Sequence, residues 1–162
     1  MLAPRKKLWT TPIQVLNEAI QVLKPTDAEL VYDIGGGEGS FIIQCAQQTS
    51  ATCIGIEIDQ ERAEFAQRLI VEQGLPESQC KMICANALEQ DFSDGDCFFL
   101  YLVPRGLRII LPILKKSTHK IRVVTYMSPF PEETPVHIFK IATSQHPDAK
   151  WPLYYYELNG SE

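Results

Sequence analysis

Residues 31–41 read VYDIGGGEGSF and hold four glycines and one aspartate. Glycine at this density is unfavourable inside a helix or a strand, because glycine loses more conformational freedom on folding than any other residue. The apolar run ELVYDI (29–34) precedes the glycines, and SFIIQCAQQ (40–48), with the apolar spacing of a helix, follows them. The glycines are therefore predicted to form a tight turn from a strand into a helix.

The same alternation of strand and helix signals continues along the chain. Apolar periodicity, Asp59 as a helix N-cap and Gly74 as a helix stop mark the boundaries. Thr11 is a possible N-cap for the first helix, with Pro12 at its first position. Helices are predicted over 12–24, 40–48, 59–74 and 104–116, the last with a possible kink at Pro112. Strands are predicted over 29–34, 52–58, 80–85, 96–103, 120–127, 135–143 and 151–158.

This order of elements predicts the fold class. Strands separated by helices run parallel and are joined by right-handed crossovers, whereas the last two strands have no helix between them and should pair as a hairpin. We expect an α/β fold, a three-layer doubly wound Rossmann-like sheet that is mostly parallel and has an antiparallel C-terminal strand pair. Such sheets bind ligands at the carboxyl ends of their strands, which is where the glycine turn falls.

The spacing of the glycines narrows the choice of ligand. The dinucleotide fingerprint G-x-G-x-x-G fails in both frames, and the pattern is instead D-x-G-x-G-x-G: Asp33, Gly35, Gly37 and Gly39. A carboxylate at the strand end would repel a pyrophosphate but attract an ammonium group. S-adenosyl-L-methionine carries an ammonium and a sulfonium and no phosphate, and its nucleoside could lie against bare glycine backbone. Gly36 is the glycine that this frame does not require.

Two later strand ends agree with a nucleoside ligand. Glu57 ends the second strand, where an acidic residue accepts hydrogen bonds from ribose hydroxyls, and Ile58 could pack on an adenine face. Asn86, with Ala87 beside it, follows the third strand and could pair with the adenine amino group or ring edge. Each signal alone is typical of a solvated strand end or a turn. Together they predict S-adenosyl-L-methionine as cofactor and S-adenosyl-L-homocysteine as product.

The bulk composition is that of an ordinary globular chain. The 162 residues are 45% hydrophobic and 22% charged, and the formal net charge of -5 at pH 7 does not favour nucleic acid. The five cysteines form no CxxC pair and lie in apolar runs, which predicts buried free thiols and no metal site. No apolar run is long enough to span a bilayer and no signal-peptide core stands at the N-terminus. We expect a cytoplasmic protein, and a mitochondrial location stays open.

VYDIGGGEGSF resembles motif I of the class I, seven-stranded S-adenosylmethionine-dependent methyltransferases, and GIEID (55–59) resembles their acidic ribose motif. WTTP (9–12), the stretch 99–116 and RVVTYM (122–127) are similar to the small archaeal and mitochondrial-type protein-lysine N-methyltransferases. The resemblance covers roughly 9–158 and implies one domain over 1–162, with an N-terminal helix about 12–24, a cofactor half about 29–88 and a substrate half about 95–158.

Some positions depart from this family's pattern. Trp9 and Thr10 stand before Pro12 in place of the usual proline-containing element, and the fifth strand ends in Thr125-Tyr126 where Ser-His is common. These departures bear on the substrate more than on the cofactor. Thr11 and Leu100 complete our set of candidate cofactor contacts.

The resemblance implies transfer of a methyl group to a lysine of a protein. Lysine must lose its proton first, against a free pKa near ~10.4, so a desolvated aromatic channel would help. Tyr101 and Tyr126, at the ends of the fourth and fifth strands, are the candidate acceptor-site residues, although a tyrosine in such a strand is often part of the core. The acidic stretch EQDFSDGD (89–96) is expected to border the site, where it could attract a lysine-rich partner or form a solvated loop.

Two other functions stay open from the residues. The chain could methylate a small molecule or RNA, or it could bind S-adenosylmethionine without catalysis as a partner subunit. No metal-ligand set supports a metal-assisted transfer.

Overall fold

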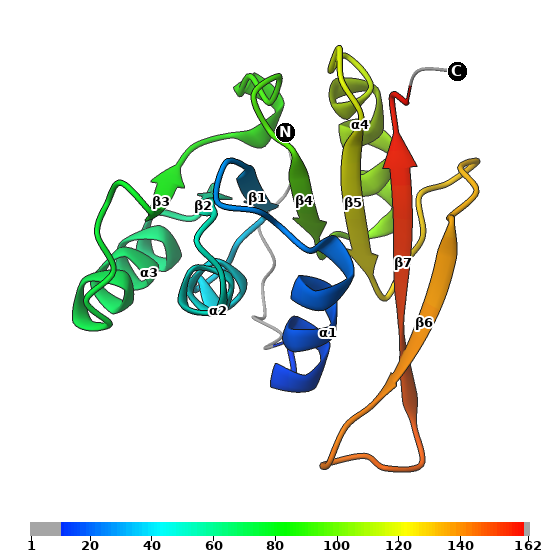
Figure 1. Cartoon of the computed structure of the whole chain (residues 1–162), viewed down its shortest axis with the longest axis horizontal. Coiled ribbons are helices and arrows are strands. Elements are labelled where there is room, and N and C mark those ends of the chain that lie inside the picture. The colour runs from blue at the N-terminus through cyan, green and yellow to red at the C-terminus, as the bar shows by residue number, and fades with distance from the viewer. Residues whose placement is uncertain (1–10, 161–162) are drawn as a thin grey trace.

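The computed structural model describes residues 11–160 and shows one twisted sheet with helices on both faces (Figure 1). The strands are β1 Leu30–Ile34, β2 Thr52–Glu57, β3 Cys80–Cys84, β4 Cys97–Leu100, β5 Ile121–Tyr126, β6 His137–Ala142 and β7 Lys150–Leu158. The helices are α1 Ile13–Leu23, α2 Ser40–Gln48, α3 Gln60–Glu72 and α4 Pro104–Leu114, with a short 3-10 helix η1 Ala87–Glu89.

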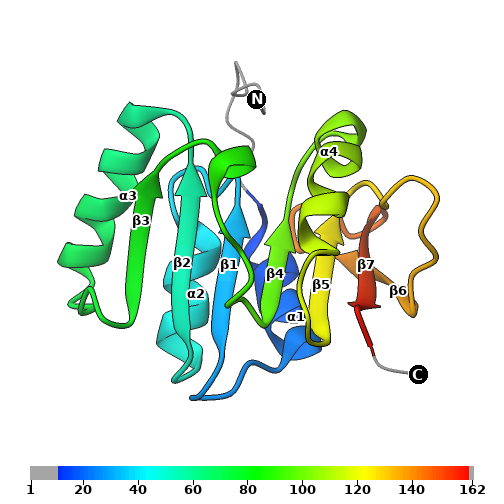
Figure 2. The same cartoon turned by 90° about the horizontal axis from the view of Figure 1, so that it is seen from above.

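The strand order is β3-β2-β1-β4-β5-β7-β6, and it confirms the predicted fold class. The first five strands pair in parallel. β7 then runs antiparallel between β5 and β6, so the C-terminal pair forms the antiparallel edge (Figure 2). The switch in strand order lies between β1 and β4, where the glycine turn emerges.

Most element boundaries agree with the sequence within two residues. Asp59 caps α3, because its Oδ1 accepts a hydrogen bond from the backbone N–H of Arg62 at 3.0 Å. Two expectations are wrong in detail. Pro12, rather than Thr11, occupies the N-cap position of α1. β4 stops at Leu100, because Pro104 opens α4 and holds Val103 in the extended region, so residues 101–103 cross from the sheet to the helix.

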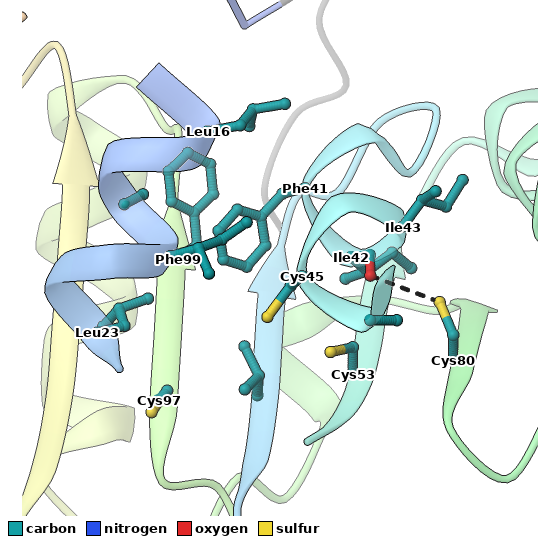
Figure 3. Packing of buried hydrophobic residues seen from close by; sticks show 14 of the residues in the cluster. Leu16, Leu23, Phe41, Ile42, Ile43, Cys45, Cys53, Cys80, Cys97 and Phe99 are labelled. Atoms are coloured by element: carbon teal, nitrogen blue, oxygen red, sulfur yellow. Dashed lines mark hydrogen bonds between the residues drawn. The ribbon is translucent and has the colours of Figure 1, made fainter. Parts of the chain in front are cut away.

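The core lies on both faces of the sheet. α1, α2 and α3 cover one face, where the Phe41 and Phe99 rings stack with centroids 4.3 Å apart (Figure 3). α4 covers the other face through Leu107, Ile110 and Leu114. Central strands covered on both sides should be apolar throughout, and every residue of β4 is buried.

The cysteines are packing groups with one exception. Cys45, Cys53, Cys80 and Cys97 are free and buried, and burial raises the pKa of the Cys80 and Cys97 thiols to about 12. The Cys80 thiol donates to the Ile42 carbonyl at 3.7 Å (Figure 3). The expectation that all five are buried is wrong for Cys84, which is exposed because it is the last residue of β3.

An ion pair ties the amino ends of the strands to α1. Arg122 on β5 donates to both carboxylate oxygens of Glu29, at 2.6 and 3.0 Å, and its Nε donates to the Leu23 carbonyl at 2.8 Å. The hydrogen bonds from Arg122 lower the pKa of Glu29. The end of α1 is thus fixed to the sheet by a charged group that also satisfies a helix carbonyl.

We expect Glu29→Gln to lower the free energy of unfolding by about 1 kcal/mol at neutral pH, because a hydrogen bond to a charged group is lost from a partly exposed pair. A carboxyl whose pKa is depressed by folding stabilises the fold above its unfolded pKa, and this stabilisation is lost as the pH falls through the folded pKa. Urea titrations at neutral and acidic pH should therefore show a larger acid loss for the wild type than for the variant. Glu77→Gln, on an exposed loop residue, is the control, and equal acid losses in wild type and Glu29→Gln would contradict the role of the pair.

Candidate functional site

The parallel register brings the carboxyl ends of four strands to one edge. Ile34 at the end of β1 pairs with Ile56 of β2 and Leu100 of β4, and Leu100 pairs with Thr125 of β5. Residues that follow these positions therefore meet at the same edge. They include the glycine turn, Glu57, Tyr101 and Tyr126, which sequence reasoning placed in the site.

The glycine turn uses left-handed backbone at the three positions of the spaced pattern. The φ angles of Gly35, Gly37 and Gly39 are 76°, 58° and 86°, a region that residues with a Cβ rarely adopt. Gly36 has no positive φ, in agreement with its being outside the frame. Gly39 occupies the N-cap of α2, so the turn leads directly into the first N–H groups of that helix.

The turn also packs too closely for side chains. A Cβ at Gly35 would lie 2.9 Å from Leu102 Cδ2, and one at Gly39 would lie 3.1 Å from the Cβ of Ala66. The first of these distances shows that the segment after β4 lies against the glycine turn. The sequence could not show this contact, because the two segments are more than sixty positions apart.

Glu57 has a second role that the sequence did not reveal. The residue is only 5% exposed, and its Oε1 accepts a hydrogen bond from the Gly37 N–H at 2.8 Å. Its Oε2 accepts from the Asp59 N–H at 2.9 Å. Each carboxylate oxygen has a further lone pair, so Glu57 holds the turn in place and keeps acceptor capacity for hydroxyl donors.

The third strand end carries Asn86. Its Oδ1 accepts from the Leu88 N–H at 3.0 Å, which makes Asn86 the cap of η1 and leaves its amide nitrogen outside that bond. Ala87 beside it is 4% exposed, and Ile58 is half-buried after β2.

Three other candidate cofactor contacts have distinct positions. Asp33 is buried at the end of β1, with 4% of its surface exposed, below the turn. Thr11 lies beside Glu38 and Ser40 in a groove next to the turn. Leu100 is fully buried at the end of β4 on the α4 face, so a cofactor would meet its backbone and not its side chain.

Tyr101 and Tyr126 lie together, as the sequence predicted for two neighbouring strand ends. Their rings meet edge to face with centroids 4.7 Å apart. Burial, and then the neighbouring Tyr101, raise the pKa of Tyr126 to about 12. The tyrosines of β7 lie deeper in the sheet, since Tyr154 pairs with Thr125 and Tyr155 with Val124.

The expectation that residues 89–96 border the site is wrong for most of this stretch. The Asp96 carboxylate accepts from the N–H of Leu30, the first residue of β1, at 2.9 Å. Asp94 accepts from the hydroxyl of Tyr32 at 2.9 Å. The segment descends from the carboxyl edge to the amino edge because it must enter β4 there, and residues 88–93 border a groove with Lys116 and Ser117 after α4.

Sequence reasoning missed Glu38. It stands between Gly37 and Gly39, is half-buried, and forms no hydrogen bond or ion pair with any residue of the described range 11–160. The signal was present in the sequence as the one charged residue inside the glycine turn. Between residues 11 and 160, no three His, Cys, Asp or Glu side chains cluster as metal ligands would, and no helix there has the length and apolarity to cross a membrane.

Comparison with known proteins identifies the family. A model of the methyltransferase domain matches residues 31–121, more than half of the chain. The chain belongs to the methyltransferase domain family. The seven-stranded Rossmann-like sheet is that of the class I S-adenosylmethionine-dependent methyltransferases, and S-adenosylmethionine is the cofactor that this family uses.

The individual relatives are methyltransferases of different kinds. A protein-lysine N-methyltransferase from Saccharolobus islandicus (strain REY15A) is 27% identical over 108 residues, which are 66% of this chain and 66% of that protein. An RNA methyltransferase from Salinibacter ruber, solved with S-adenosyl-L-homocysteine, superposes with a TM-score of 0.83 at 22% identity over 95% of each chain. An O-methyltransferase from Thermotoga maritima superposes with a TM-score of 0.72 at 16% identity, over 97% of this chain and 69% of its own. The fold is thus shared by enzymes that act on different acceptors.

The geometry of the glycine turn and of Glu57 fits S-adenosylmethionine. Left-handed glycines leave bare backbone where a nucleoside would lie, and Glu57 offers acceptors to ribose hydroxyls. The first N–H groups of α2 face the same edge and can receive a carboxylate.

We expect Gly37→Arg to abolish binding of S-adenosylmethionine, because the new side chain would occupy the space over the turn and strain a φ of 58°. Calorimetry should detect no binding while circular dichroism shows the native fold. Gly74→Arg is the matched control, since Gly74 has a φ of 73° and no atom within 4 Å of an added Cβ. Unchanged affinity in Gly37→Arg would place the cofactor elsewhere.

We expect Glu57→Gln to weaken S-adenosylmethionine binding by roughly 1.5–3 kcal/mol, because a charged acceptor is lost and the turn is held less firmly. Titration calorimetry of Glu57→Gln beside Glu77→Gln measures the loss. If the two variants bind equally well, Glu57 supports the fold and not the ligand.

Proposed function

We propose that this methyltransferase transfers methyl groups to lysine side chains of a protein substrate. The observation that carries the proposal is the Tyr101–Tyr126 ring contact at the carboxyl ends of β4 and β5. The contact between Leu102 and Gly35 supports this placement, because Leu102 directly follows Tyr101. The similarity to a protein-lysine N-methyltransferase supports the same acceptor.

The tasks of the chain's own residues follow from the reaction. The bound cofactor supplies an electrophilic methyl group on a sulfonium, and the lysine nitrogen takes it with release of the thioether product. The protein therefore has to align the two reactants and to exclude water. The glycine turn and Glu57 hold the cofactor end, and the tyrosine pair lines the acceptor end.

The tyrosines act on the lysine through its surroundings. An aromatic, poorly hydrated wall disfavours the charged ammonium and favours the neutral amine that attacks. Tyr126 does not serve as the base, because its pKa of about 12 keeps the phenol protonated near neutral pH. The lysine proton leaves to solvent before the amine enters.

The proposal predicts the fate of labelled methyl groups. The protein incubated with tritiated S-adenosylmethionine and a cell extract should place label in material that protease removes and nuclease does not. Acid hydrolysis should release the label as methyllysine. Label found only in RNA or only in small molecules would contradict the proposal and favour the open alternatives, among them the RNA chemistry of the Salinibacter neighbour.

We further expect Tyr101→Ala to lower kcat/KM for a lysine peptide by about tenfold, or ~1.4 kcal/mol, while Tyr101→Phe stays within about threefold. The ring, and not the hydroxyl, desolvates the acceptor. Tyr155→Ala is the control, because Tyr155 is also half-buried but pairs with Val124 deeper in the sheet. Equal losses in Tyr101→Ala and Tyr155→Ala would reduce the role of Tyr101 to stability.

A further inference from the structure

A groove of about 600 Å³ lies next to the glycine turn, and neither the family nor the reaction assigns it a role. Its walls come from the start of α1, the outer face of α2, the end of α3 and the tip of the β6–β7 hairpin. That hairpin extends past the carboxyl ends of β4 and β5 (Figure 1). The Gln14 amide donates to the Ser144 hydroxyl at 3.1 Å and so links the hairpin tip to α1.

The groove is lined by side-chain amides. Five glutamines border it: Gln14, Gln44, Gln47, Gln73 and Gln145. An amide side chain has two N–H donors and an oxygen with two lone pairs, and the bonds among these residues use only part of that capacity. Gln47, for example, donates one N–H to the Gln73 oxygen at 3.0 Å. Such groups match the alternating donors and acceptors of an extended polypeptide backbone.

Glu38 gives the groove its charge. Among residues 11–160 it is the only ionisable residue that lines the groove, and within that range its carboxylate has no hydrogen-bond or ion-pair partner. It is half-buried at the end of the groove nearest the cofactor site, between Gly37 and Gly39. A carboxylate in this position attracts a basic side chain.

The same lining disfavours nucleic acid. RNA binding gains most of its affinity from Lys and Arg contacts to phosphates, and no Lys or Arg among residues 11–160 lines this groove. Glu38 would repel a phosphate there. The charge of the groove therefore selects a polypeptide over RNA.

We propose that this groove binds an extended segment of the protein substrate next to the target lysine, and that Glu38 pairs with a basic side chain of that segment. The proposal rests on the proposed function, because the bound segment delivers its lysine to the Tyr101–Tyr126 pair. The docking proposal adds a substrate preference: the enzyme prefers unfolded or loop segments that carry a second basic residue near the target lysine.

Binding can be measured apart from catalysis. The probe is a short fluorescent peptide of Gly, Ser and Ala with one lysine and one nearby arginine, titrated by anisotropy with protein saturated with S-adenosyl-L-homocysteine. Glu38→Gln should raise the Kd about three- to fivefold, as for a partly exposed ion pair, and should abolish the preference over a peptide with glutamine in place of arginine. Glu77→Gln is the charge-matched control and should bind as the wild type does.

A second measurement locates the peptide. A photo-reactive amino acid placed at position 44 should cross-link to the peptide, whereas the same group at position 64, on the exposed side of α3, should not. Cross-linking from position 44 to residues 1–10 of the same chain, or to a single-stranded RNA of similar length that outcompetes the peptide, would overturn the proposal.

The outcomes separate this proposal from the proposed function. Glu38-dependent peptide binding without any lysine methylation would support the docking groove and sink the lysine activity. Lysine methylation with unchanged peptide affinity in Glu38→Gln would support the lysine activity and overturn the docking groove. A fall in S-adenosyl-L-homocysteine affinity in Glu38→Gln would assign Glu38 to the cofactor site and overturn the proposed peptide groove. The absence of any peptide binding would overturn it as well.

Discussion

The hydrogen bonds from the Gly37 and Asp59 N–H groups to the Glu57 carboxylate are the constraint on which the site depends. They join the turn after β1 to the turn after β2, two segments that otherwise meet only through backbone contacts at Ile56. Without this carboxylate, the left-handed turn would lose a charged acceptor that offsets part of its conformational cost. The position of α2, which begins at Ser40 three residues after Gly37, follows from the same bonds.

A second consequence of the turn is where the acceptor can enter. Because Gly35 has no Cβ, Leu102 can lie against it, and the chain after β4 then stays close to the cofactor edge before α4 begins. Tyr101 belongs to the same segment, and its ring meets that of Tyr126 at the end of β5. The alignment that methyl transfer needs is thus prepared by backbone geometry, and the side chains add desolvation.

The fold and the cofactor positions could be predicted from the sequence because both depend on local patterns. Alternating strand and helix signals imply parallel strands, and residues that follow parallel strands share an edge. Contacts between distant segments could not be predicted in this way. The path of residues 89–96 away from the site and the exposure of Cys84 depend on how far each strand extends before the chain leaves the sheet. The second role of Glu57 was hidden because its side chain returns to a turn twenty positions earlier.

These contacts also show which carboxylate is placed to interact with a substrate. The acidic stretch 89–96 does not attract a partner through free carboxylates alone. Asp94 and Asp96 accept hydrogen bonds from Tyr32 and Leu30, at or toward the other end of the sheet. The half-buried Glu38 instead faces a groove in which no other residue between 11 and 160 carries a charge. One poorly screened carboxylate in a neutral, amide-lined groove discriminates between partners more sharply than several solvated ones, because screening weakens exposed charges far more than partly buried ones. If the proposed docking holds, this single charge gives the groove its preference for a basic segment, even though the chain as a whole is acidic.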